Sequence, residues 1–157
     1  MQEIERKFLV KSNAYREQAY KRSTIKQGFL NLDPQRTVRV RVKRNSAQLT
    51  VKGLSSDDGL SRHEWEIDIP KKDALFLLDL CHNEFIEKER YEVKCGEHVF
   101  EIDEFHGSNE GLVLAEIELN DENESFVKPD WLGTEVTGQP EYYNANLSVN
   151  PYLKWAK

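Results

Sequence analysis

The chain has 157 residues, of which 38% are hydrophobic and 32% are charged. We expect a single domain covering residues 1–157 with a small hydrophobic core. The many charged residues must either belong to a functional site or cover a wide solvated surface. The formal net charge of −6 argues against a nucleic-acid-binding protein that works through bulk positive charge. The charged N-terminus, the lack of an apolar run of membrane-spanning length and two cysteines without metal-type spacing predict a cytoplasmic protein with no membrane contact.

Short segments rich in β-branched and aromatic residues alternate with turn-forming clusters, which predicts a mostly β, α+β fold. In chain order, strands are expected at residues 2–10, 24–31, 36–44, 47–53, 61–69, 86–94, 97–105 and 111–119. Helices are expected at residues 12–20, 71–82 and 150–156. Asn150 and Pro151 suit the cap and first turn of the last helix. The tail after residue 125 is otherwise expected to be irregular, with packing anchors at Trp131, Tyr142, Tyr143 and Trp155.

Charged side chains follow the period of two that separates the faces of a strand. Arg39 and Arg41 alternate with valines, and Glu116 and Glu118 flank an isoleucine. The same alternation recurs at Glu3, Glu5, Lys7, Arg62, Glu64, Glu66, Lys88, Arg90, Glu101 and Asp103. Like charges two positions apart repel each other, so a sheet surface gains nothing from pairing them. A ligand that needs several cations, together with a metal that needs several carboxylates, explains the pattern.

Two arrangements of this charged face are open. An antiparallel sheet with one solvated face would account for any single strand. Eight strands are also enough to close a sheet on itself. We favour a closed eight-stranded antiparallel β-barrel, a tunnel with a charged lumen and with helices packed outside. The reverse barrel, with its apolar face inside, remains an alternative.

The charged residues suit phosphate and hard metal ions. Arginine binds phosphate oxygens bidentately and lysine adds point charges, which indicates a phosphate site at Lys7, Arg39, Arg41, Lys52, Lys88 and Arg90. Carboxylates suit one or two Mg²⁺ or Mn²⁺ ions, which indicates a metal site at Glu3, Glu5, Asp103, Glu116 and Glu118. Zinc is disfavoured because the four histidines and two cysteines do not cluster. No Gly-rich phosphate loop is present.

The Glu-x-Glu-x-Lys pattern of residues 3–7 resembles the N-terminal signature of the CYTH superfamily, the triphosphate tunnel metalloenzymes. Further motifs follow in the family's order at Gln27-Gly28-Phe29-Leu30, Arg39-x-Arg41, Thr50-Val51-Lys52, residues 61–66, Lys88-Glu89-Arg90-Tyr91, Glu101-Ile102-Asp103, Glu116-Ile117-Glu118 and residues 131–137. The resemblance covers nearly the whole chain. It implies an eight-stranded tunnel that binds a triphosphate with Mg²⁺ or Mn²⁺.

By this resemblance, the metal-side and phosphate-side residues are those named above. Glu64 lies at an acidic position of the family, and catalytic roles fall to Lys88, Glu5 and Glu118, with Lys88 as a lysine base. The chain departs from the family at two places. Phe29 stands where a tyrosine is frequent, and Ala145 stands where the family's tail often carries a lysine. Either one phosphate contact is missing or Lys154 replaces it.

The resemblance implies hydrolysis of inorganic tripolyphosphate to pyrophosphate and phosphate by a monomer or homodimer. Two alternatives stay open. One is another enzyme on the same scaffold, a thiamine triphosphatase or a class IV adenylate cyclase. The other is a non-catalytic module that binds polyphosphate or a nucleotide. The full acidic set argues against this module, because binding phosphate alone needs fewer carboxylates.

Overall fold

The computed structural model describes residues 2–155, whose regular structure is mainly antiparallel strand. The strands are β1 (Gln2–Val10), β2 (Lys21–Asn31), β3 (Arg36–Val42), β4 (Ala47–Gly53), β5 (Ser61–Asp68), β6 (His82–Cys95), β7 (His98–Phe105), β8 (Val113–Leu119) and β9 (Leu132–Glu135). The α-helices are α1 (Tyr15–Gln18), α2 (Lys71–Leu78) and α3 (Asn144–Val149). Short 3₁₀ helices lie at Gly107–Asn109, Pro140–Tyr142 and Tyr152–Lys154. The expected mainly β fold with few helices is confirmed.

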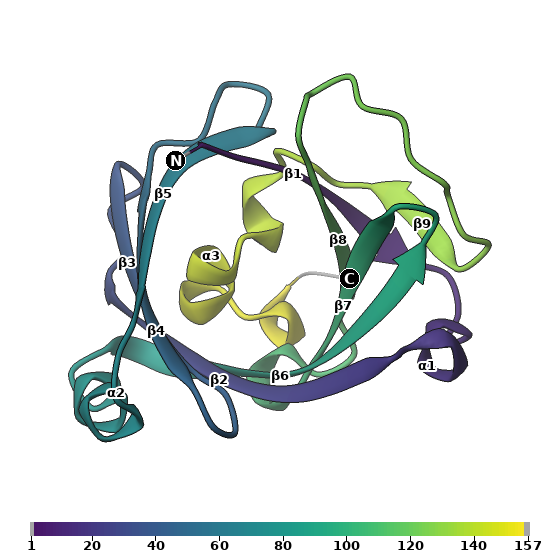
Figure 1. Cartoon of the computed structure of the whole chain (residues 1–157). Helices are drawn as coiled ribbons and strands as arrows, with labels where there is room; N and C mark the ends of the chain where they lie inside the picture. Colours follow the sequence, from purple (N-terminus) through teal and green to yellow (C-terminus); the bar gives the residue numbers. More distant parts are fainter. Residues whose placement is uncertain (1, 156–157) are drawn as a thin grey trace.

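The described strands form one antiparallel sheet in the order β5-β4-β3-β2-β6-β7-β8-β1-β9. Most strands pair with a neighbour in the sequence, whereas β1 pairs with the distant strands β8 and β9. At its start, β1 also pairs with β5, and Glu3 lies opposite Arg62 there. Figure 1 shows the strands curving around a common axis, with α3 drawn near that axis. The first strand is therefore hydrogen-bonded along both edges, which fixes the direction of its side chains.

Two expected helices are present in shortened form. The helix expected at residues 12–20 is only the four-residue α1, and its Tyr15 is buried. The helix expected at residues 71–82 ends at Leu78, because the chain enters β6 at His82 and must pair with β2. Contacts with distant strands, rather than local helical periodicity, thus set both boundaries.

The tail differs most from expectation. Within the described residues, the helix expected at 150–156 is only the 3₁₀ turn Tyr152–Lys154. Its expected cap is wrong, because Asn150 caps the C-terminus of α3 and donates its backbone N–H to the carbonyl of Asn146. The expected irregular tail also contains β9, which pairs with Phe8 and Val10 of β1. Four residues are too few to show a strand period in sequence, so pairing with β1 defines this element.

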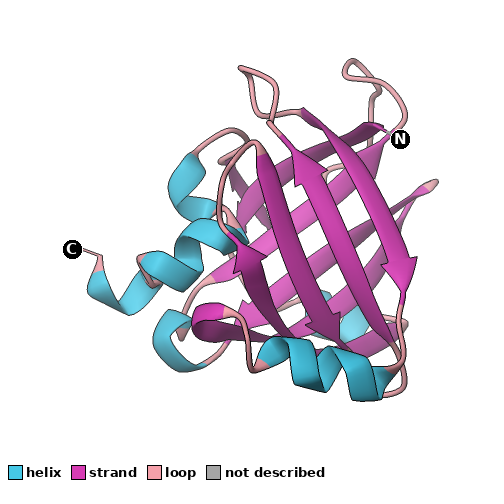
Figure 2. Cartoon of the chain, turned by 90° about the vertical axis from the view of Figure 1, so that its left-hand side faces the viewer, coloured by secondary structure: helices cyan, strands magenta, loops and turns pink. Residues whose placement is uncertain are grey.

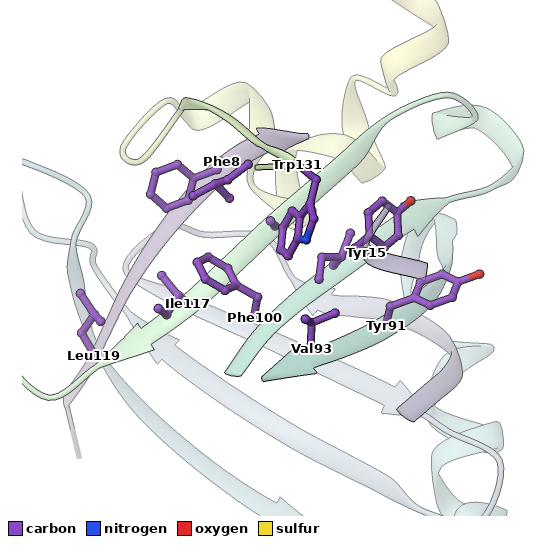
Figure 3. Packing of buried hydrophobic residues seen from close by; sticks show 11 residues of the cluster. Phe8, Tyr15, Tyr91, Val93, Phe100, Ile117, Leu119 and Trp131 are labelled. Atoms are coloured by element: carbon purple, nitrogen blue, oxygen red, sulfur yellow. The ribbon is translucent and has the colours of Figure 1, made fainter. Parts of the chain in front are cut away.

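The largest apolar cluster lies on the face of β1, β6, β7 and β8 opposite their predicted site residues. Figure 3 shows its side chains packed together. Trp131 is 1% exposed, and the rings of Tyr15 and Phe100 pack edge-on against it with centroids 5.9 and 5.4 Å away. Its indole N–H also donates to Oε1 of Gln18 over 3.0 Å. Trp131 is therefore a packing anchor, as expected, and it fastens α1 and the segment before β9 onto the sheet.

Two further clusters complete the packing. α2 covers β3 and β4, with Ala74 and Leu78 buried against Val40 and Val42. The tail forms the third cluster around Leu147, which is fully buried. Figure 2 shows the C-terminal helices gathered at one end of the strands. None of the helices formed by residues 2–155 has the length and hydropathy required to cross a bilayer.

Candidate active site

Strand pairing brings the charged residues of β1 and β8 together. Glu5 lies opposite Glu118, and Lys7 lies opposite Glu116. Directly opposed residues in an antiparallel pair project from the same face of the sheet. Four charged side chains from the first and the eighth strand therefore share one face, as the alternation in the sequence predicted.

This face borders a cavity of about 560 Å³. The predicted site residues that line it are Glu3, Glu5, Lys7, Arg39, Arg41, Lys52, Glu64, Lys88, Arg90, Glu116 and Glu118. They come from β1, β3, β4, β5, β6 and β8. The structure thus gathers both predicted sets, cationic and acidic, around one space.

Asp103 is not among the lining residues and lies beside the cavity between two of its cations. The carboxylate of Asp103 is 1% exposed and accepts two hydrogen bonds from Arg90, at 2.8 and 2.9 Å. The ammonium of Lys88 lies 2.9 Å from the same carboxylate. Burial acts to raise the pKa of Asp103, but Arg90 and Lys88 hold it far below its usual range. In this geometry Asp103 orients the two cations, and its role as a metal ligand stays a prediction.

Burial and mutual repulsion act on the cations that line the cavity. Burial lowers the pKa of Lys88 to about 7, against the opposing effect of Asp103 and with the help of Arg90. Burial and the nearby guanidinium of Arg39 likewise lower the pKa of Arg41 to about 9. The Nε of Arg39 is buried and has no hydrogen-bond partner among the described residues. Buried donors without acceptors, set among crowded cations, suit the oxygens of a polyanion.

The acidic side contains two pairs of carboxyl groups in mutual contact. Glu5 and Glu116 lie within hydrogen-bonding reach of each other, and this contact acts in opposite directions on their two pKa values. Burial, Glu116 and Glu3 raise the pKa of Glu5 well above its ordinary value. Burial opposes ionisation of Glu116 as well, yet Lys7 and the bond from Glu5 hold its pKa well below the ordinary value.

The second carboxyl pair is Glu3 with Glu64, bridged by Lys52. The ammonium of Lys52 lies 2.9 Å from Glu3 and 3.4 Å from Glu64. Burial raises the pKa of Glu64, and the hydrogen bond with Glu3 raises it further. Burial, Glu3 and Glu101 also raise the pKa of Glu118. Carboxyl groups this close together repel each other when ionised, so they suit a metal cation bound between them.

The donor set fits a hard divalent cation. Its donors are all carboxylate oxygens, the ligands that Mg²⁺ and Mn²⁺ prefer. Among residues 2–155, no three His, Cys, Asp or Glu side chains already surround a common point. The acidic side therefore offers pairs of carboxylates suited to a metal ion, and a phosphate oxygen would fill further positions in the coordination of that ion.

The cavity also has lining residues that were not predicted from the sequence to belong to the site. Arg62, Glu66 and Glu101 line it and show the same two-residue alternation as their neighbours, so the signal for them was present. Tyr143 and Asn144 line it from the tail. These two carry no local pattern, because their place depends on how the tail folds back over the sheet.

The tail touches two of the predicted phosphate-side residues. The ammonium of Lys7 donates to the carbonyl of Tyr142 over 3.2 Å and lies 5.4 Å from the ring centre of Tyr143. Asn144 accepts a hydrogen bond from Lys88 over 2.9 Å. Ala145 lines the cavity where the family's lysine was expected, whereas Lys154 is exposed and is not a lining residue. The structure does not bring Lys154 into the place of that lysine.

Fold and cavity together define a protein that holds a polyanion between a cationic wall and an acidic wall. The CYTH domain family matches residues 1–149. The chain therefore belongs to the CYTH family, and the resemblance seen in the sequence is confirmed.

Individual relatives agree with this assignment. The chain is 50% identical over 151 residues to an inorganic triphosphatase of Acetivibrio thermocellus, covering 96% of this chain and 95% of that protein. It is 33% identical over 153 residues to an inorganic triphosphatase of Nitrosomonas europaea, covering 96% of this chain and 99% of that protein. The crystal structure of the inorganic triphosphatase NE1496 superimposes with a TM-score of 0.67 at 30% identity, covering 93% of this chain and 97% of that one.

Proposed function

We propose that this protein is an inorganic triphosphatase that hydrolyses tripolyphosphate to pyrophosphate and phosphate. The observation that carries the proposal is that one cavity holds the six predicted phosphate-side cations, all buried or half-buried, together with two carboxyl pairs. The shared name of two relatives at 50% and 33% identity supports the same reaction.

We also propose that the strands form a closed eight-stranded tunnel with a charged lumen in a single domain. The pairing of β1 with β5 supports closure, because these strands bracket the other six in the sheet order. Closure removes exposed strand edges and gives the alternate side chains of every strand a common interior. A monomer or homodimer in the cytoplasm remains the prediction from sequence.

In the proposed mechanism, Arg39, Arg41 and Arg90 bind the phosphate oxygens and align the chain of phosphoryl groups. Lys88 has a pKa of about 7, so its ammonium and amine forms are both accessible near neutral pH. We assign Lys88 as the base that takes a proton from the attacking water while the bridging P–O bond breaks and the proton then passes to the leaving phosphate. Lys7 and Lys52 add positive charge along the substrate.

We propose that Mg²⁺ or Mn²⁺, as one or two ions, completes the site. The residues suited to hold metal are Glu3, Glu5, Asp103, Glu116 and Glu118, with Glu64 beside them. When bound, the ion screens the phosphate charge and activates water. Glu5 and Glu118 face each other across the pair of strands β1 and β8. We assign these two carboxylates to orient the attacking water.

The deciding experiment compares substrates under one set of conditions. Purified protein is incubated with Mg²⁺ or Mn²⁺ and, in turn, tripolyphosphate, thiamine triphosphate and ATP, and the products are identified by phosphorus NMR. We expect equal amounts of pyrophosphate and phosphate, mainly from tripolyphosphate. Preferred turnover of thiamine triphosphate would instead establish a thiamine triphosphatase, and formation of cyclic AMP from ATP would establish an adenylate cyclase. Tight binding without turnover would establish a binding module.

Two variants test the assignment of residues. Glu5→Gln is expected to lower kcat about 100-fold and to weaken the dependence on metal. Arg39→Ala is expected to raise KM about 10- to 100-fold, because a charge-assisted phosphate contact is lost. Arg36→Ala is the matched control, since Arg36 is 60% exposed and pairs with Asp33 outside the cavity. Wild-type kinetics in both site variants would refute the assignment.

A further inference from the structure

Four side chains form a continuous chain of hydrogen bonds where the tail meets the cavity. Nε of Arg41 donates to Oε1 of Gln27 over 3.1 Å. Nε2 of Gln27 donates to Oδ1 of Asn144 over 2.8 Å. Nζ of Lys88 donates to the same Oδ1 over 2.9 Å. The side chain of Asn144 thus connects the C-terminal tail to two cations of the phosphate side.

The direction of each bond in this chain is fixed by its two ends. Arginine and lysine side chains carry only donors. The oxygen of Gln27 must therefore face Arg41, which leaves its amide N–H₂ for Asn144. The oxygen of Asn144 must then accept from both Gln27 and Lys88. Each amide has a single favourable orientation, so the two amides form a rigid bridge.

Burial makes this bridge hard to replace. Gln27 is fully buried, and Lys88 is 1% exposed. Asn144 is the first residue of α3, which is anchored three residues later by the fully buried Leu147. Removing one of the two acceptors of an ammonium this deeply buried is costly.

The same bridge sets how the ammonium of Lys88 is used. An ammonium has three N–H donors. Asp103 and Asn144 each accept one, at 2.9 Å in both cases. Two fixed acceptors on different elements, β7 and α3, hold the nitrogen in place. Its third position is an N–H donor for a phosphate oxygen in the ammonium form, and it carries the lone pair that accepts a proton from water in the amine form.

We infer that Asn144 is a positioning residue of the proposed triphosphatase reaction: with its amide held by Gln27, it fixes the side-chain nitrogen of Lys88 for catalysis. The inference rests on the proposed function and adds a tail residue to a site built from strands. The tail thereby completes the cationic wall as well as covering one end of the sheet.

The test uses three variants of the full chain. Asn144→Leu removes the acceptor at nearly constant size. Asn144→Asp keeps an oxygen for both donors. Asn146→Leu is the matched control, because Asn146 lies in the same helix and borders the cavity, yet its amide donates to the carbonyl of Pro140 within the tail.

We expect Asn144→Leu to lower kcat about 10- to 100-fold with tripolyphosphate and Mg²⁺, since a charge-assisted buried bond is lost. Asn146→Leu is expected to stay within about twofold of wild type, as surface substitutions usually do. Asn144→Asp should restore most of kcat, while its negative charge raises KM for the anionic substrate. Equal kcat values for Asn144→Leu and wild type, or no recovery in Asn144→Asp, would overturn the inference.

A second measurement does not depend on turnover. Brief acylation of the lysines, followed by mass spectrometry, reports how freely each amine reacts. In Asn144→Leu we expect faster labelling of Lys88 and unchanged labelling of Lys7, which is held by the tail through the carbonyl of Tyr142. Faster labelling of both lysines would mean that the tail has detached, and would overturn a local positioning role. If the wild type does not hydrolyse tripolyphosphate but labelling follows the expected pattern, the proposed function fails and the contact of Asn144 with Lys88 stands.

Discussion

Asp103→Asn is the substitution whose effect the structure defines most sharply. It removes the negative charge that lies between Arg90 and Lys88, while the amide keeps the size of the side chain. Arg90 and Asp103 are 6% and 1% exposed, and two bonds of 2.8 and 2.9 Å join them. The variant therefore leaves two buried cations next to each other without their shared anion.

The expected loss follows from this geometry. Removing one partner of a buried ion pair costs about 3–5 kcal/mol, because the remaining charge is left uncompensated. The asparagine oxygen still accepts one hydrogen bond, so we expect a loss near the lower end, about 3 kcal/mol. Such a loss is a large share of the 5–15 kcal/mol that typically stabilises a domain.

The assay is urea unfolding of wild type and variant in the presence of a chelator, with and without tripolyphosphate. Added tripolyphosphate should recover part of the loss, since the anion supplies negative charge to the same cations. The matched control is Glu101→Gln, because Glu101 makes one bond of 3.1 Å to Arg90 and is 38% exposed. We expect the control to lose less than about 1 kcal/mol. A loss below about 1 kcal/mol in Asp103→Asn as well would refute the reasoning.

The effect of pH has a definite sign. Arg90 and Lys88, acting against burial, depress the pKa of Asp103 in the folded state. The stability that its carboxylate contributes is therefore fully present above the unfolded pKa of about 3.9 and is lost as the pH falls through the folded pKa. The difference between wild type and variant should stay constant from pH 7 down to about pH 4.

Three further predictions concern stability away from the reacting groups. Burial acts to raise the pKa of Glu89, but bonds from a threonine and an arginine of β2 hold it below the ordinary value. Glu89→Gln should therefore cost about 1 kcal/mol at pH 7 in urea unfolding, and the cost should vanish as the pH falls through the folded pKa. Gly138 has φ +78, and an added Cβ would lie 2.6 Å from a carbonyl oxygen of the β4–β5 loop. Gly138→Ala should lower the melting temperature more than Gly107→Ala, whose site has φ +63 and open space for the Cβ; equal shifts would contradict the close approach. Leu147→Ala should cost about 2–5 kcal/mol and raise KM for tripolyphosphate by loosening the tail, whereas the exposed Leu153→Ala should change neither.

The sequence predicted those parts of the site that depend on strand alternation. Arg39 and Arg41 line the cavity because an unbroken period of two fixes their face once the valines between them are buried against α2. Asp103 obeys the same period, yet it does not line the cavity. Its short side chain is drawn into the bidentate pair with Arg90, and a pattern of faces does not show which charges neutralise each other.

The structure of the tail could not be predicted from local sequence patterns for a different reason. Asn144 reaches Gln27 and Lys88 only after α3 has docked on the sheet. β9 exists because β1 offers it a free edge beyond the pairing with β5. Both elements depend on packing against distant parts of the chain. Helix propensity and strand period are local properties of the sequence, so they do not predict this packing.

The pairing of β1 also constrains how the molecule assembles. Two runs of successive strands, β2 to β5 and β6 to β8, join neighbours that are close in the sequence. The pairing of β2 with β6 joins the two runs, and β1 pairs with the last strand of each run, at β5 and at β8. A contact between distant segments carries a high entropic cost and forms slowly. During synthesis β1 therefore waits for its main partner until β2 to β7 have been made, so Glu3 and Glu5 meet Glu116 and Glu118 late in the assembly of the sheet.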